Sequence, residues 1–377
     1  MKIVEVEPIM LTEWRPMLFV RVETEDGLWG IGEAGLTSRE PAVAAMISTL
    51  TEHLVGQPSD RIEHLWQMMW RSGFHPSGQV LTSAIAAIDL ALWDIKAKRL
   101  GIPACDLLGG QVRDRIDTYC HIKGSSPDEL VASARRAVSE GWKFLRWELF
   151  EDADGLFEPQ RAIERNLLEW RILREELGDT VELCVDLHTK LSAPDAIRYC
   201  RAVERYRPFF IEDPVRSEHP EGYRRVRAQT SVPLAAGEQM GTKWQLRSLI
   251  EEELVDYLRV DLCIAGGLTE ARKLAAMCEA HMMDIILHNP IGPVSTAACV
   301  EFNLGTSNSA LMELPRRPGE TLTGAIQHHA TWRDGCLHSS DAPGLGLDVD
   351  WDALRAISFV PRALPVLHRA DGSFTNW

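Results

Sequence analysis

Three acidic residues stand at even spacing in the middle of this 377-residue chain, each at the end of a short apolar run. Asp186 closes ELCVD, Glu212 closes FFIE and Glu238 closes PLAAGE, so 26 residues separate each acid from the next. Three carboxylates that converged on one point would repel one another unless a hard divalent cation joined them. The pattern therefore predicts an Mg²⁺ site, one ion per chain. A zinc site is disfavoured because it would draw on His or Cys.

The same rhythm continues with Asp261, His288 and Glu313, which again follow apolar runs at intervals of 23, 27 and 25 residues. A period near 25 residues fits one strand, one helix and two loops. Repetition of such a unit closes a parallel (β/α) barrel, in which the carboxyl ends of all strands face one end. We therefore expect all these polar side chains in a single pocket.

Proton transfer next to a carboxylate is the chemistry that this set can perform. A divalent cation that chelates a substrate carboxylate lowers the cost of removing the adjacent proton. His288 is the candidate base, and Asp261 would hold its other ring nitrogen. Glu313 would reach the remaining carboxylate oxygen of the substrate, for which it has to be protonated. His188 follows Asp186 by two residues, so strand alternation would put both on one side, where His188 could protonate a departing hydroxyl.

Each of these residues also has a purely structural interpretation. A carboxylate after an apolar strand is often a helix N-cap or a solvated loop residue, and only the repeated spacing argues against that. For His188, a packed loop residue remains the alternative to a general acid. His75, in RSGFHPSGQ, is interpreted as a loop residue that contacts the substrate.

The elements that must position these residues form two units. Residues 1–35 alternate like strands and residues 40–110 have helical periodicity, which predicts an α+β domain over 1–115. Apolar strands and amphipathic helices then alternate, which predicts the barrel over 116–349. The last segment, 350–377, is expected to pack back onto the first domain. The expected barrel strands are DTYCHI, FLRWEL, ELCVDLH, FFIEDP, PLAAGE, YLRVDL, DIILHN and ALMELP. Ser126 and Thr269, each followed within three residues by an acid, are expected to begin helices.

Composition narrows the class of protein. The formal net charge of −15 and the lack of a basic run argue against nucleic acid or an anionic membrane as partner. Eight cysteines without a C-x-x-C pair indicate free thiols in a reducing compartment. The amino terminus does not have the cationic and apolar regions of a signal peptide, and no apolar run reaches the ~20 residues of a membrane helix. We expect a soluble cytoplasmic protein that acts on a small molecule.

Longer segments add a resemblance to a known family. SAIAAIDLALWDIKAKRLGIPACDLLGG, VDLHTKLSAP, YRPFFIEDPV, LHNPIGPVSTAAC and the terminal DGSFTNW resemble the mandelate racemase subgroup of the enolase superfamily, and within it the D-galactonate dehydratases. The resemblance implies a capping domain over a modified TIM barrel and Mg²⁺ on the three evenly spaced acids. It also implies a His288–Asp261 base dyad that abstracts protons from R-configured acids, Glu313 as carboxylate partner and His188 as acid. A homo-oligomer, octameric in relatives, is expected by analogy.

One motif departs from the family pattern. Racemases of the subgroup carry Lys-x-Lys after the second barrel strand, where this chain has Arg146 and Glu148. Arginine stays protonated and is a poor base, which disfavours two-base racemisation. The D-galactonate dehydratases are expected to carry Lys and Asn there. We expect Arg146 and Glu148 to bind substrate, together with Trp14 and Arg15 of the loop EWRPM and with His75.

Three functions are compatible with these residues. The leading hypothesis is a Mg²⁺-dependent dehydratase of a sugar acid (an aldonate), which removes the C2 proton and the C3 hydroxyl to give a 2-keto-3-deoxy acid; D-galactonate is the first candidate substrate. A cycloisomerase or lactonising enzyme of a related sugar acid is the second. The third is a regulatory or binding homologue with low activity, against which the intact metal and base set argues.

Overall fold

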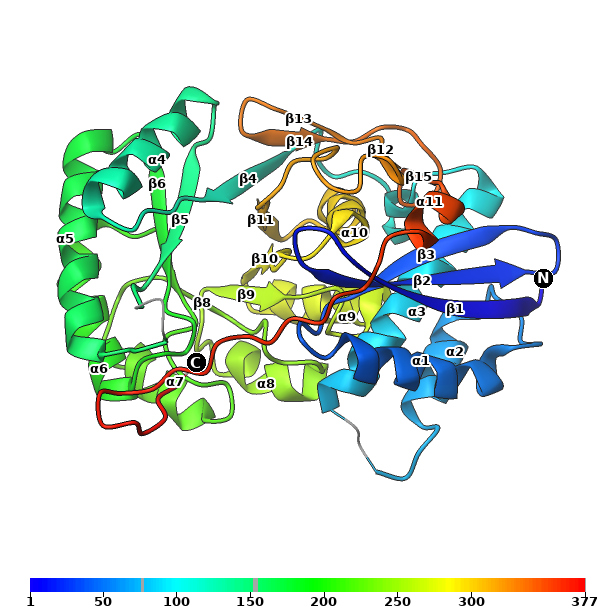
Figure 1. The fold of residues 1–377 in the computed structure, drawn as a ribbon, viewed down its shortest axis with the longest axis horizontal. Coiled ribbons are helices and arrows are strands. Elements are labelled where there is room, and N and C mark those ends of the chain that lie inside the picture. Colours follow the sequence, from blue (N-terminus) through cyan, green and yellow to red (C-terminus); the bar gives the residue numbers. More distant parts are fainter. Residues whose placement is uncertain (76–77, 152–154, 377) are drawn as a thin grey trace.

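The computed structural model describes residues 1–75, 78–151 and 155–376. Two parts are visible in Figure 1: a three-stranded sheet with helices, coloured blue and cyan, and a closed barrel built from the middle of the chain. Within the described residues, no helix combines the length and the apolar character needed to cross a membrane.

The first part is an antiparallel meander covered by helices on one face. Its strands are β1 (Ile3–Thr12), β2 (Pro16–Thr24) and β3 (Trp29–Ala34), and its helices are α1 (Glu40–Leu54), α2 (Ile62–Trp70) and α3 (Gly78–Leu100). Helix α3 packs against β3 at very close range, because a Cβ at Gly30 or Gly32 would lie 2.1 or 1.8 Å from the carbonyl oxygens of Ala91 and Ala87. These two positions therefore require glycine.

The second part is a closed barrel of eight parallel strands, as expected. Its strands are β4 (Ile116–His121), β5 (Phe144–Glu148), β6 (Glu182–Asp186), β7 (Phe210–Glu212), β8 (Leu234–Ala236), β9 (Tyr257–Val260), β10 (Asp284–Leu287) and β11 (Ser309–Glu313). Pairing of β11 with β4 closes the ring. The helices between them are α4 (Pro127–Ser139), α5 (Pro159–Leu177), α6 (Ala193–Val203), α7 (Pro220–Arg227), α8 (Lys243–Glu251), α9 (Gly267–Ala280) and α10 (Pro293–Leu304).

One of the two expected helix starts is confirmed. The Ser126 side chain caps α4 by accepting a hydrogen bond from the Glu129 amide. The start expected at Thr269 is wrong, because α9 begins two residues earlier, after Gly266 in a left-handed conformation. The Thr269 amide donates instead to Asp89 of α3, at 3.0 Å, and thereby joins the two parts of the molecule.

Residues 316–345 contain short strands outside the barrel repeat. These are β12 (Ile326–His328), β13 (Thr331–Arg333) and β14 (Cys336–His338); β12 pairs with β15 (Leu347–Val349). Strand β14 pairs with the beginning of β4 in antiparallel fashion, which extends the barrel sheet at the end away from the strand carboxyl termini.

The carboxyl-terminal segment packs against both parts of the molecule, not only against the first. Helix α11 (Trp351–Arg355) lies against β1, where Arg355 pairs with Glu7 at 2.7 Å. Farther along, the backbone of His368 pairs with Leu156, in the loop after β5. Figure 1 shows this segment, in red, crossing from the sheet to the barrel. The expectation that all of 350–377 completes the first domain is therefore wrong for the residues near His368.

Candidate active site

Strand alternation explains why the polar residues share one pocket. An apolar layer fills the barrel interior, formed by Tyr119, Cys184, Phe210, Ala235, Ile286 and Leu311 with Phe144 and Tyr257 packed against it. Side chains two residues farther along a strand point to the same face. The next layer, at the carboxyl ends of the strands, therefore faces the same interior: His121, Arg146, Asp186, Glu212, Arg259, His288 and Glu313. We call this end of the barrel the mouth.

His288 and Asp261 form the expected dyad. The His288 Nδ1 atom lies 2.7 Å from Asp261 Oδ2, and the carboxylate is buried whereas the imidazole is 16% exposed. The second Asp261 oxygen accepts a hydrogen bond from the Cys263 amide, which fixes the carboxylate. Nε2 of His288 is thereby turned away from the dyad, toward Glu238 at 3.5 Å. This geometry leaves one ring nitrogen directed at the mouth.

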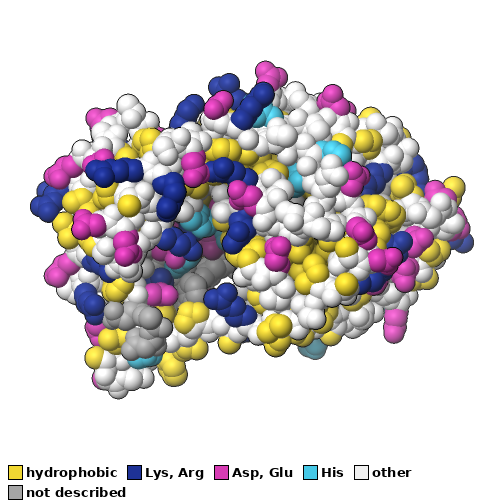
Figure 2. Space-filling view, turned by 45° about the horizontal axis from the view of Figure 1, so that its top comes forward, with side chains coloured by type: hydrophobic (Ala, Val, Ile, Leu, Met, Phe, Trp, Pro, Cys, Tyr) yellow, Lys and Arg dark blue, Asp and Glu magenta, His cyan; other side chains and the backbone are white. Residues whose placement is uncertain are grey.

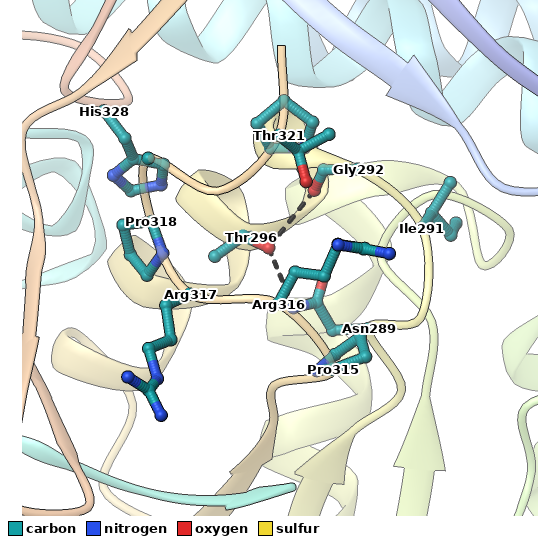
Figure 3. Close-up of a pocket in the computed structure, with 12 residues that line it drawn as sticks. Asn289, Ile291, Gly292, Thr296, Pro315, Arg316, Arg317, Pro318, Thr321 and His328 are labelled. Carbon is teal, nitrogen blue, oxygen red and sulfur yellow. Dashed lines mark hydrogen bonds between the residues drawn. The ribbon is translucent and has the colours of Figure 1, made fainter. Parts of the chain in front are cut away.

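The loop that carries His288 is held by hydrogen bonds behind the pocket. The backbone N–H of Asn289 donates to Glu313 Oε2 at 3.0 Å. The side-chain amide of Asn289 donates to the Glu313 carbonyl and to Thr296 Oγ1. Thr296 in turn donates to the Gly292 carbonyl, and Figure 3 shows these residues lying together beside Arg316. His288 therefore lies on a loop with little freedom to turn.

His188 lies beside Asp186, but not for the expected reason. Strand β6 ends at Asp186, and the chain then adopts positive φ angles of 45° at His188 and 55° at Thr189. This turn brings His188 Nε2 to 2.7 Å from Asp186 Oδ2 and its Nδ1 to 3.5 Å from Glu148. Burial lowers the pKa of His188, but the two carboxylates outweigh burial and raise it above the usual value.

The three evenly spaced acids lie together at the mouth, but an arginine separates two of them. Asp186 and Glu212 are paired across neighbouring strands, and Glu238 follows β8. Arg146 Nη1 contacts Asp186 and lies 3.3 Å from Glu212 Oε2. Among the described residues, no three His, Cys, Asp or Glu side chains are gathered in a ready-made metal site.

The donor chemistry nevertheless fits a hard divalent cation. All three candidate ligands are carboxylates. Glu238 Oε2 is buried and has no hydrogen-bond partner in the described part of the chain. Burial, together with Asp213, Glu212 and Asp186, raises the pKa of Glu238 well above its usual value. Such a crowded carboxylate gains most from a cation, so the expected set of Asp186, Glu212 and Glu238 remains a prediction that the donor types support.

Glu313 is charged, contrary to the expectation of a protonated acid. Its oxygens lie 2.7 Å from Arg259 Nη2 and 2.7 Å from His121 Nε2. Burial would raise the pKa of Glu313, but Arg259, the hydrogen bond from His121 and Arg146 hold it well below its usual range. Glu313 was expected to be surrounded by anions, but cationic side chains from other strands lie next to it and stabilise its negative charge.

Two of these partners were not expected from the sequence. Arg259 is fully buried, donates to Glu212 and Glu313, and also donates to the Ile286 and Leu287 carbonyls. In the sequence, Arg259 could have been recognised as the lone basic residue inside the apolar run YLRV. His121 closes the first barrel strand just as Asp186 closes the third, and that position was its signal.

A pocket of about 590 Å³ opens over the mouth. Among its lining residues are Trp14, Arg15, Arg146 and Glu148, and also His188, Glu238, His288 and Glu313. In Figure 2 the hollow on this face contains His side chains and is bordered by Lys and Arg. Lys123, Arg316 and Arg362 also line the pocket. A basic border of this kind attracts an anionic substrate to an otherwise acidic protein.

His75, expected to contact the substrate, lies in the loop before α3. Its side chain is exposed and its ring lies edge-on against Phe74, 5.1 Å between centroids. The described lining of the pocket does not include it, and the expected substrate contact of His75 stays a prediction.

Comparison with known proteins agrees with the fold and with the arrangement of the mouth. Residues 9–109 match the family "Mandelate racemase / muconate lactonizing enzyme, N-terminal domain", and residues 129–353 match "Enolase C-terminal domain-like". The chain belongs to the mandelate racemase and muconate lactonizing enzyme family of the enolase superfamily. The resemblance inferred from sequence segments is thereby confirmed.

Three similar proteins show what members of this family bind or do. A D-galactonate dehydratase of Ralstonia nicotianae is 38% identical over 96% of both chains. A D-mannonate dehydratase of Caulobacter sp. is 34% identical over the whole of both chains. The crystal structure of an enolase from Pantoea ananatis, with bound D-gluconate and Mg, superposes with a TM-score of 0.93 at 29% identity, over 100% of this chain and 99% of that one.

Proposed function

We propose that this protein is a Mg²⁺-dependent sugar acid dehydratase that converts an aldonate into a 2-keto-3-deoxy acid, with D-galactonate as the first candidate substrate. The observation that carries the proposal is the pair of histidines that flank the carboxylate cluster. His288 and His188 both line the pocket, each held by its own carboxylate, Asp261 and Asp186. Elimination of water needs one group that takes a proton and another that gives one.

The residues divide the reaction between them. Asp186, Glu212 and Glu238 would hold the cation, which when bound makes the proton next to the substrate carboxylate more acidic. His288 Nε2 accepts the C2 proton while Asp261 stabilises the resulting imidazolium. His188 donates a proton to the departing C3 hydroxyl.

We assign Glu313 a role in positioning other residues, in place of the expected contact with the substrate carboxylate. Because it is ionised and held by Arg259 and His121, it does not donate a hydrogen bond to the substrate carboxylate. It keeps Arg259, His121 and the His288 loop in place instead.

A library of acid sugars tests the proposal directly. The purified protein is incubated with Mg²⁺ and each of a set of aldonates and aldarates, and 2-keto acid is measured as its semicarbazone by absorbance. Dehydration of D-galactonate or another aldonate supports the proposal. Signal with no aldonate would overturn it, and an isomerised or lactonised product without keto acid would favour a cycloisomerase.

The same library tests face selection at C2. His288 is the base on one face, whereas on the other the two Lys positions of the racemases are occupied by Arg146, which stays protonated, and Glu148. We expect at least about 100-fold preference for one C2 epimer, the 2R acid, because general base catalysis contributes about 10²–10⁴. Comparable rates with both epimers would show that a second base exists.

Glu238 gives a test of the metal ligands. The substitution Glu238→Gln removes one of three negative charges and one anionic donor. Mg²⁺ affinity measured by calorimetry is expected to fall at least about tenfold. Glu148→Gln, which removes a charge at the same mouth from a residue outside the ligand set, is the matched control and should have a smaller effect. Unaltered affinity in the Glu238 variant would exclude the ion from this site.

A further inference from the structure

Two arginines enter the carboxylate cluster, and they are held in different ways. Arg259 is fully buried and donates to two backbone carbonyls, those of Ile286 and Leu287, at 3.2 and 2.9 Å. Its remaining donors reach Glu212 and Glu313. Backbone acceptors cannot move away, so Arg259 is a fixed cation of the barrel.

The Arg146 guanidinium makes all its described polar contacts with side chains. Its Nη1 contacts Asp186 and Glu212, and its Nη2 lies 3.1 Å from His121 Nε2, 3.5 Å from Glu313 and 3.6 Å from Glu148. Its Nε is buried without a hydrogen-bond partner in the described part of the chain. The guanidinium is therefore incompletely satisfied where it lies, between two sets of anions.

The two sets of anions differ in function. Asp186 and Glu212 are two of the proposed metal ligands, and the oxygens that Arg146 contacts are ones that a cation would use. Glu148 and Glu313 lie on the other side of the guanidinium, and Glu148 is 37% exposed at the pocket. A divalent cation and a guanidinium on the same two oxygens would repel each other strongly in this buried setting.

We infer that Arg146 is an exchangeable cation of the site, which leaves Asp186 and Glu212 when a divalent metal binds and moves toward Glu148 and Glu313. The inference rests on the proposed metal site and goes beyond it by assigning a movable partner. After the exchange, the guanidinium lies between the metal ligands and the pocket lumen, where it can position the substrate. Metal binding and the Arg146 contacts are then linked, so that each weakens the other.

Removal of Arg146 should therefore strengthen metal binding. The variant Arg146→Gln has no guanidinium to displace, and its mouth is more negative by one charge. We expect Mg²⁺ to bind about tenfold more tightly than to the unmodified protein, measured by calorimetry after EDTA treatment and dialysis. Arg146→Lys, which keeps the charge but contacts fewer oxygens, should lie between the two.

Arg316→Gln is the matched control. Arg316 lines the same pocket and also carries one positive charge, but it lies over Trp14, 4.7 Å from the ring centroid. Its loss should change Mg²⁺ affinity about twofold at most, because screening weakens charge effects over distance. A gain confined to the Arg146 variants identifies direct competition. An equal gain in Arg316→Gln would reduce the effect to general electrostatics and overturn the inference.

Thermal unfolding supplies a second measurement that does not depend on turnover. In EDTA, Arg146→Gln should unfold at a lower temperature than the unmodified protein, because three carboxylates face one another with one cation fewer. Saturating Mg²⁺ should then raise its Tm by more, since a tighter ligand stabilises more. Unchanged or weaker Mg²⁺ binding in both Arg146 variants would contradict the inference. Absence of Mg²⁺ binding in every protein, the unmodified one included, would remove the proposed metal site and this inference with it.

Discussion

Replacement of His288 by Asn is expected to abolish both dehydration and exchange of the substrate C2 proton with deuterium. Asn is similar in size to the inner part of the imidazole and keeps a polar group near Asp261, but it cannot accept the proton. Arg146, which stays protonated, cannot replace the missing imidazole as a base. Proton NMR in D₂O follows the C2 resonance and the product in one tube.

The control for this variant is a histidine outside the pocket. His281, at the end of α9, pairs with the exposed Glu253 at 3.3 Å. His281→Asn should dehydrate and exchange at the unmodified rate. Exchange at C2 in the His288 variant would show that another group removes the proton, and the dyad with Asp261 would then serve another purpose.

Replacement of His188 by Asn is expected to slow dehydration by about 10²–10⁴, the usual contribution of a general acid. Exchange at C2 should survive, because His288, Asp261 and the proposed metal ligands remain and the base proton exchanges with solvent before it returns. Loss of dehydration with retention of exchange would separate the two histidines by function. The same NMR experiment measures both rates.

Two other outcomes would be informative for His188. Full dehydration by the variant would contradict the acid assignment. Loss of exchange together with dehydration would mean that His188 acts through Asp186, its partner at 2.7 Å, and thus through the metal site. Mg²⁺ calorimetry on the variant distinguishes this second case, since only it predicts weaker binding.

The residues at the mouth could be predicted from the sequence because the signal for them is local. The barrel strands are short apolar runs, and in several of them a polar residue follows an interior residue by two positions, as Asp186 follows Cys184 and Glu313 follows Leu311. Strand alternation and a period near 25 residues are sufficient to place such residues on one face at one end. The eight strands and the position of His288 at the mouth could therefore be predicted from the sequence.

Contacts between strands were decided only by the tertiary structure. The charge of Glu313 depends on Arg259 and His121, which lie 54 and 192 residues away in the sequence. The site of His188 depends on a left-handed turn rather than on alternation, and the path of His368 depends on where the barrel loops lie. Local sequence sets which way a side chain faces. Its ionisation and its partners depend on distances between strands, and these exist only after the barrel has closed.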